Sequence, residues 1–170
     1  MARNVEIKAR LTDFEATLAC AAVLADAGPM PIEQDDTFFA CSHGRLKLRD
    51  FGDGTGELIF YRRDDVAGPK TSHYVRTPTP DPDGLRAALT LAHGVVGRVR
   101  KHRTLYLAGR TRIHLDRVEG LGDFLELEVV LADDEAVEVG VAEANVLMAR
   151  LGVEPSSLVE GAYVDLRSAD

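Results

Sequence analysis

Charged residues stand at every second position in several short segments of this chain, and apolar residues fill the positions between them. Residues 45–49 alternate basic side chains with leucines, and residues 125–129 alternate apolar side chains with glutamates. Successive side chains of a β-strand point to opposite faces. Each segment therefore predicts a strand with one apolar face for a hydrophobic core and one fully charged face.

The same spacing recurs in other segments. The groups that share a predicted strand face are Glu6 with Lys8, Lys101 with Arg103, and Arg112 with His114 and Asp116. A half-exposed sheet with its polar face toward water explains any one of these strands. Taken together they favour another arrangement, because several strands carry only basic residues or only glutamates, whereas solvent faces normally intersperse both signs.

The remaining pattern predicts an antiparallel α+β fold in a single domain, residues 1–170. Eight strands are expected, at residues 5–9, 36–41, 44–50, 56–63, 70–77, 97–107, 110–118 and 124–132. Helices are expected from Thr12, an N-cap whose capping box Glu15 completes, to Gly28, over residues 83–92 and 133–151, and after Pro155. Since the strands outnumber the helices, a barrel is the natural way to pair every strand edge.

The charge of the chain is segregated along the sequence. The formal net charge is −8, yet residues 45–112 hold 14 basic and 7 acidic residues, a net of +7, which leaves −15 for the rest. An acidic chain is not expected to bind nucleic acid or a membrane surface, because both are polyanions. A basic middle between acidic ends instead fits an anion that carries metal cations.

Several other chemistries lack their motifs in this sequence. There is no HExxH zinc motif, GxxxxGK[ST] phosphate loop, GxSxG elbow or Rossmann glycine fingerprint. The chain has no apolar run of membrane-spanning length and no apolar N-terminal leader, so a cytoplasmic protein is expected. Cys20 and Cys41 suggest neither a disulfide nor a metal site, and both are expected to be packing residues.

A polyphosphate ligand accounts for the division of charge between strands. Arg and Lys bind nonbridging phosphate oxygens, and Arg often binds two of them at once. Carboxylates hold Mg²⁺ or Mn²⁺, which prefer oxygen ligands and bridge the same phosphate oxygens. In a closed barrel with its charges inside, like charges would repel until ligand and metal were bound, so this arrangement is costly unless it is functional.

Ordered motifs along nearly the whole chain carry a resemblance to a known family. They read NVEIK at residues 4–8, QDDTFF at 34–39, GRLKLR at 44–49, YRR at 61–63, KTS at 70–72, KHRTLY at 101–106, HLD at 114–116 and GLGDFLELE at 120–128. In this order and spacing they resemble the CYTH domain, or triphosphate tunnel metalloenzyme, family. That family includes class IV adenylyl cyclases, which the last motif resembles most, thiamine triphosphatases and inorganic tripolyphosphatases. The resemblance implies an eight-stranded antiparallel tunnel with helices packed outside.

The resemblance also implies which residues hold a triphosphate. By position, these are Lys8, Arg49, one of Arg62 and Arg63, Lys101 and Arg103. Two further lysines are candidates, since Lys47 shares the strand face of Arg49 and Lys70 reaches either the phosphates or the solvent.

Metal and catalytic roles are implied in the same way. Divalent metal, Mg²⁺ or Mn²⁺, is expected at Glu6, Glu126 and Glu128, and Asp116 is a candidate metal ligand or base. Lys101 joins Asp116 as a candidate catalytic residue. Tyr163 either packs over the tunnel mouth or belongs to the core.

One position departs from the opening ExExK motif of the family, because Asn4 stands where the first Glu belongs. Asn is neutral and a poorer ligand for a hard cation. The departure therefore bears on the exact reaction more than on the class of ligand.

Three roles fit these residues. A class IV adenylyl cyclase-like enzyme, in which the ribose 3′-hydroxyl of ATP attacks the α-phosphorus and pyrophosphate leaves, is expected first. A phosphohydrolase for thiamine triphosphate, tripolyphosphate or a nucleoside triphosphate would use the same tunnel with water attacking the γ-phosphorus. A noncatalytic nucleotide or polyphosphate binder would not need the metal carboxylates that this chain has. The resemblance is also compatible with a homodimer.

Overall fold

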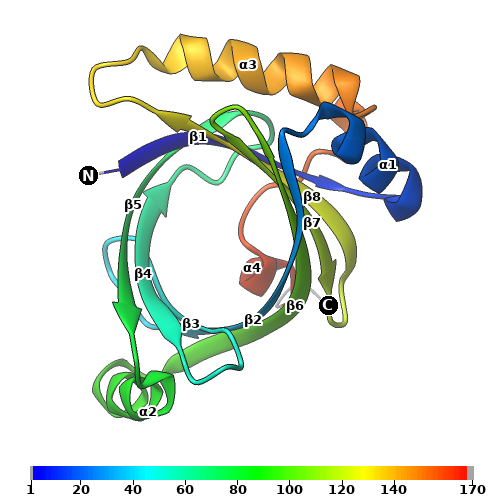
Figure 1. Cartoon of the computed structure of the whole chain (residues 1–170). Coiled ribbons are helices and arrows are strands. Elements are labelled where there is room, and N and C mark those ends of the chain that lie inside the picture. Colours follow the sequence, from blue (N-terminus) through cyan, green and yellow to red (C-terminus); the bar gives the residue numbers. More distant parts are fainter. Residues whose placement is uncertain (1, 168–170) are drawn as a thin grey trace.

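The computed structural model describes residues 2–167 and confirms an α+β fold in which eight antiparallel strands close into a barrel (Figure 1). The strands are β1 (Ala2–Arg10), β2 (Ala27–Phe39), β3 (Arg45–Asp50), β4 (Gly56–Arg63), β5 (Lys70–Thr79), β6 (Val95–Ala108), β7 (Thr111–Val118) and β8 (Gly122–Leu131). Their order around the barrel is β1-β5-β4-β3-β2-β6-β7-β8, and β1 closes it by pairing with both β5 and β8.

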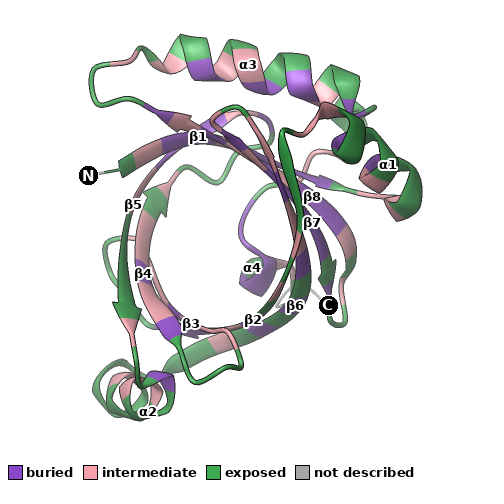
Figure 2. Cartoon of the chain, in the orientation of Figure 1, coloured by how far each residue is buried: buried purple, intermediate pink, exposed green. Residues whose placement is uncertain are grey.

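Helices lie around this barrel. They are α1 (Phe14–Leu24), α2 (Pro82–His93), α3 (Val137–Arg150) and α4 (Tyr163–Arg167), with a single 3₁₀ turn, η1 (Pro155–Ser157). In Figure 2 the strands beneath α1 and α3 are largely buried, whereas α2 is mostly exposed. Among residues 2–167, no helix combines the length and the apolar composition that a bilayer crossing requires.

The main hydrophobic core lies outside the barrel wall, under α1 and α3. Its buried members are Ile7, Ala21, Tyr106, Ile113, Leu115, Leu125, Leu127, Leu147 and Leu151. Gly140 lets α3 approach the wall closely, since a Cβ at this position would lie 2.7 Å from Leu131 Cδ2 and 2.9 Å from Val5 Cγ2. Because the apolar strand faces are used on the outside, the alternating charged faces point into the barrel.

The C-terminal segment closes one end of the barrel. Ala162, Tyr163 and Val164 form a buried cluster with the inward-facing Phe38, Val99 and Phe124. The rings of Tyr163 and Phe124 meet edge to face at a centroid distance of 4.9 Å. Both expectations for Tyr163 therefore describe the same position, a buried aromatic that packs over one end of the interior.

The start and end of the first helix differ from the sequence prediction. Asp13, not Thr12, is the N-cap, and its carboxylate accepts from the backbone N–H of Ala16. The helix ends at Leu24 and β2 already begins at Ala27, because the chain here pairs with the long strand β6. Gly28 fits this pairing, since a Cβ there would lie 2.7 Å from the carbonyl oxygen of Leu105.

Two smaller expectations are also corrected. The third helix begins at Val137 and not at residue 133, because Arg3 donates to the carbonyls of residues 132, 133 and 135 and holds them in a turn. Cys20 and Cys41 are both free and exposed. They are not packing residues, since Cys20 lies on the solvent side of α1 and Cys41 follows the end of β2.

Candidate functional site

The barrel interior holds a cavity of about 280 Å³ that is rich in ionisable side chains. Within residues 2–167, its basic lining residues are Lys8, Lys47, Arg49, Arg63, Arg76, Lys101, Arg103 and Arg112, and its acidic ones are Glu6, Asp36, Glu57, Glu126 and Glu128. Eight basic and five acidic groups leave a formal excess of +3 with histidine neutral. The interior of a chain with a net charge of −8 is thus positively charged, which favours an anionic ligand over a cationic one.

One wall of the cavity is organised around Asp36 of β2. This carboxylate accepts two hydrogen bonds from Arg49, both 2.8 Å long, and one of 2.8 Å from Lys47. Burial opposes ionisation of Asp36, but the charges of Arg49 and Lys47 outweigh it and hold the pKa of the carboxyl well below its ordinary value. Asp36 therefore orders two cations of β3 without neutralising both.

A second buried carboxylate, Asp116 of β7, organises the neighbouring wall. It accepts from Arg103 Nε and Nη2, each at 2.6 Å, and from the Tyr163 hydroxyl at 2.8 Å. Lys101 Nζ lies 3.7 Å away. Burial lowers the pKa of Lys101 to about 7, and the charge of Arg103 acts in the same direction. Asp116 itself is fully buried behind these cations and does not line the cavity.

Residues of β1, β4 and β8 form further ion pairs inside the barrel. Lys8 Nζ lies 3.3 Å from Glu126 Oε1 and 4.0 Å from the centre of the Tyr163 ring. Arg63 pairs with Glu6 and also donates to the carbonyl of Gly161 at 2.9 Å. Some strands, such as β3 and β8, present one sign of charge to the cavity, and others, such as β1, present both, so that opposite charges lie beside one another across the lining.

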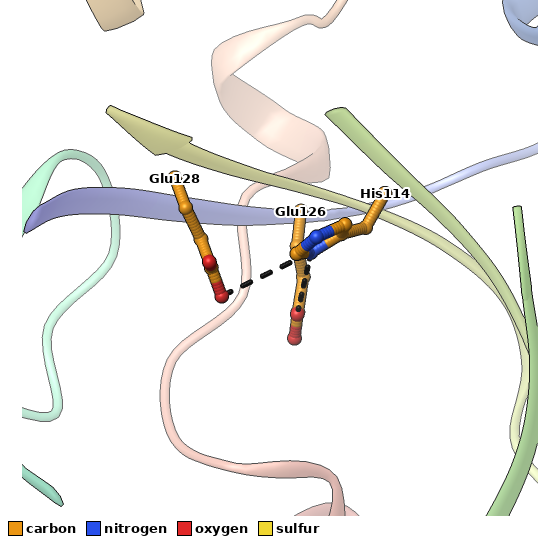
Figure 3. Close-up of side chains that lie close together, drawn as sticks. All are labelled: His114, Glu126 and Glu128. Carbon is orange, nitrogen blue, oxygen red and sulfur yellow. Dashed lines mark ion pairs between the residues drawn. The ribbon is translucent and has the colours of Figure 1, made fainter. Parts of the chain in front are cut away.

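A carboxylate and imidazole cluster lies on β7 and β8 (Figure 3). His114, Glu126 and Glu128 each present a ligand atom within 4.8 Å of the others. His114 Nδ1 lies 3.9 Å from an oxygen of each glutamate. Burial lowers the pKa of His114, with the charge of Arg103 adding to the effect, so the imidazole is neutral near pH 7. Neutral imidazole and ionised carboxylates are donors that a divalent cation can use, so these residues fit the metal that the sequence implies.

The structure brings most of the sequence-predicted residues to this cavity. Those in its lining are Glu6, Lys8, Lys47, Arg49, Arg63, Lys101, Arg103, Glu126 and Glu128. Arg62 is exposed on the other face of β4, so Arg63 is the member of that pair that points inward. Lys70 is buried but outside the lining, where it donates to the carbonyl of Val66 at 2.8 Å. Glu6 is not part of the three-residue cluster.

Sequence reasoning did not single out several other lining residues. His114 was visible only as one residue of a charged strand face, since its position opposite Glu126 depends on the register of β7 and β8. Asp36 lies in the QDDTFF motif, but its pairing with two basic residues of β3 needs the register of β2 and β3. Gln34 also lines the cavity, as does Asn4, which the sequence marks only as a departure from the ExExK motif; the buried side-chain oxygens of both have no hydrogen-bond partner within the described residues.

Comparisons with known proteins agree with this architecture. A family model described as CYTH domain matches residues 2–163. Adenylate cyclase CyaB of Aeromonas hydrophila is 27% identical over 94% of this chain and 86% of its own length.

Two solved structures are similar to the chain. The PH1012 protein of Pyrococcus horikoshii has a TM-score of 0.85 and 25% identity, and the match covers 96% of this chain and 98% of that one. HpAC1 from Hippeastrum, a protein described as having a dominant triphosphatase activity, has a TM-score of 0.67 and 17% identity, and the match covers 98% of this chain and 96% of that one.

Proposed function

Since the chain belongs to the CYTH family, we propose that it is a metal-dependent enzyme that converts ATP to cyclic AMP and pyrophosphate. The observation that carries this proposal is the cavity, in which an excess of basic side chains surrounds a carboxylate and imidazole cluster. Such a site suits a polyphosphate that carries a divalent cation. The name of the Aeromonas relative, adenylate cyclase, supports the choice of ATP.

In this proposal the basic residues hold the triphosphate. Asp36 fixes the guanidinium plane of Arg49, and Asp116 fixes that of Arg103, so both are oriented before a ligand arrives. A guanidinium held in this way donates to two phosphate oxygens with little loss of side-chain freedom. Lys47 adds a cation from the strand of Arg49, and Lys8 adds one from β1, so that the phosphates are surrounded rather than held on one side.

The cluster of His114, Glu126 and Glu128 would hold the divalent cation, Mg²⁺ or Mn²⁺. A cation bound there would neutralise phosphate charge and polarise phosphoryl oxygens. Glu6 is paired with Arg63, and we assign it to positioning that arginine beside the cluster.

The cyclisation itself is an in-line displacement at phosphorus. The ribose 3′-oxygen forms a bond to the α-phosphorus as its proton is lost, the bond from that phosphorus to the bridging oxygen breaks, and pyrophosphate leaves with the electron pair. We assign Lys101 to proton exchange at the reacting oxygens, because its amine lines the cavity 3.7 Å from Asp116. Asp116 is assigned a positioning role, since both of its oxygens are occupied behind Arg103.

The lining also offers contacts for an organic group. Ile32, Phe51 and Leu105 are apolar members of the same lining and accompany the charged residues. Apolar and aromatic side chains bind the flat face of a nucleobase, whereas inorganic tripolyphosphate has no use for them.

A triphosphate phosphohydrolase is the second candidate. The same walls would hold the triphosphate, with water attacking the γ-phosphorus instead of a ribose hydroxyl attacking the α-phosphorus. The departure at Asn4 favours this alternative, because it removes a carboxylate from the β1 motif. HpAC1 has the same fold and is described as having a dominant triphosphatase activity, so the fold by itself does not choose between the two reactions.

The test is product analysis with purified full-length protein. ATP, tripolyphosphate and thiamine triphosphate are each incubated with Mg²⁺ or Mn²⁺, and with EDTA as the metal-free control. Cyclic AMP with an equal amount of pyrophosphate is the expected result. Release of orthophosphate would replace the cyclase proposal with the phosphohydrolase, and binding of all three compounds without turnover would refute both enzyme activities.

The pH dependence of triphosphate binding is expected to follow the protonation of the Lys47 amine. Burial lowers the pKa of Lys47 to about 8, and the charge of Arg49 acts in the same direction. A bound polyanion favours the protonated amine, so binding weakens as pH rises through this value. Between pH 7 and pH 9 the dissociation constant for tripolyphosphate should rise about 10-fold more in the wild type than in Lys47→Arg, which stays charged. Calorimetric titration of both proteins checks this, and equal pH slopes would contradict it.

A further inference from the structure

We propose that His114 is a direct metal ligand and that its imidazole makes the site select Mn²⁺ and Co²⁺ over Mg²⁺. The inference rests on the proposed function only in placing a divalent cation at this cluster. It goes further by naming a nitrogen donor and the class of metal that this donor favours.

The first argument is the separation of the donor atoms. His114 and Glu126 are directly opposite each other on paired strands, and Glu128 lies on the same face of β8. His114 Nδ1 is 3.9 Å from an oxygen of each glutamate, which is too long for a hydrogen bond. Two ligands of one cation, each bound at about 2.1 Å, lie about 3 to 4 Å apart. The observed separation therefore suits atoms that share an ion and not atoms that bond to each other.

The second argument is an unpartnered atom. His114 is only 4% exposed, and its buried Nδ1 has no hydrogen-bond partner in the described part of the chain. A buried polar atom that lacks a partner costs free energy. The residue lines the cavity, so a ligand inside the barrel can supply the missing partner. A histidine that served only to fill the interior would not need a free nitrogen at this place.

The third argument is competition for the two carboxylates. Glu126 lies 3.3 Å from Lys8 and 2.7 Å from Arg103, and Glu128 lies 2.9 Å from Arg112. A metal must compete with these side-chain cations for both glutamates, so the glutamates alone bind a divalent ion less tightly. His114 Nδ1 has no hydrogen-bond partner among the described residues and no cation paired with it, so its lone pair is available to a metal.

The choice of metal follows from this donor. Mg²⁺ dehydrates reluctantly and takes oxygen ligands in near-ideal octahedral geometry. Imidazole nitrogen suits first-row transition metals, whose affinity for a given site rises from Mn²⁺ to Co²⁺. Since the glutamates are shared and the imidazole is free, we expect affinity to rise from Mg²⁺ to Mn²⁺ and again to Co²⁺.

The test is metal binding by the full-length protein without substrate, so its outcome does not depend on turnover. Calorimetry should give about 10-fold tighter binding for Mn²⁺ than for Mg²⁺ in the wild type. In His114→Asp, which offers oxygen instead of nitrogen, this ratio should fall to about 2 or less. His43→Asp changes an exposed histidine in the loop before β3 and should keep the wild-type ratio.

Pulsed electron paramagnetic resonance of bound Mn²⁺ gives a second readout that needs no variant. The wild-type spectrum should contain ¹⁴N coupling from an imidazole, and this coupling should be absent in His114→Asp and present in His43→Asp. A wild-type spectrum without nitrogen coupling, or an unchanged Mn²⁺ to Mg²⁺ ratio in His114→Asp, would overturn the inference while leaving the proposed function intact. Conversely, nitrogen-coupled Mn²⁺ in a protein that turns over none of the triphosphates would refute the proposed function alone.

Discussion

Replacing Glu126 with glutamine is expected to lower turnover of the triphosphate by about 10³-fold at saturating metal and substrate. Glu126 contacts both the basic residues and the metal cluster of the site. Its two oxygens contact Lys8 and Arg103, and it belongs to the metal cluster with His114. Burial alone would raise the pKa of Glu126, but Lys8 and Arg103 hold it well below the ordinary value, so the carboxylate is ionised at working pH. Glutamine keeps the size of the side chain and removes that charge.

The measurement is the initial rate of product formation, with circular dichroism to verify that the variant is folded. Glu15→Gln is the matched control, because Glu15 is exposed on α1 and pairs with Arg117 on the outside of the barrel. It should keep the wild-type rate. A Glu126→Gln protein that is folded and equally active would refute the assignment of metal to this cluster.

The fold could be predicted largely from alternation. Residues 45–49 and 125–129 show both the strand period and the face that must be covered, and β4 is found at its predicted residues 56–63. The beginning of β2 could not be predicted, because residues 27–35 have little alternation and become a strand by pairing with β6. Long-range pairing overrides the local signal of Gly28 and Pro29 for the end of a helix.

The site was predictable in its residue types but not in its contacts. Alternation places Arg103 and Asp116 on inward faces, yet only the register of β6 and β7 shows that Asp116 lies directly opposite Arg103. The same holds for His114 and Glu126. The alternation in the sequence shows which strand faces are charged, whereas strand order and register decide which of these charges neutralise one another.

Replacing Asp116 with asparagine is expected to lower the free energy of unfolding by about 3 to 5 kcal/mol at pH 7. Asp116 is fully buried and accepts both hydrogen bonds of the Arg103 fork, with Lys101 Nζ at 3.7 Å. Asparagine has nearly the same volume, so no cavity forms, but Arg103 loses the carboxylate that accepts both bonds of its fork and keeps only Glu126, and Lys101 loses its nearest carboxylate. Breaking a buried ion pair on one side is costly because the remaining charge stays away from water. Urea denaturation of both proteins measures the difference.

Asp35→Asn is the control that distinguishes the effect of burying an ion pair from the effect of forming one. Asp35 also binds two arginines, Arg98 and Arg100, but it does so on the solvent side of β2 and β6, with 26% of its side chain exposed. This substitution should cost about 1 kcal/mol or less.

The pH dependence of the same pair of proteins gives a second check on Asp116. Arg103 and Lys101 outweigh burial and keep the pKa of Asp116 below its ordinary value of 3.8. A lowered pKa in the folded protein means that the stabilising contribution is present above about pH 4 and is lost as the pH falls through the folded-state pKa. The difference in unfolding free energy between wild type and Asp116→Asn should therefore be larger at pH 5 than at pH 3. A cost for Asp116→Asn no larger than that for Asp35→Asn would show that the buried carboxylate does not hold the two cations in place.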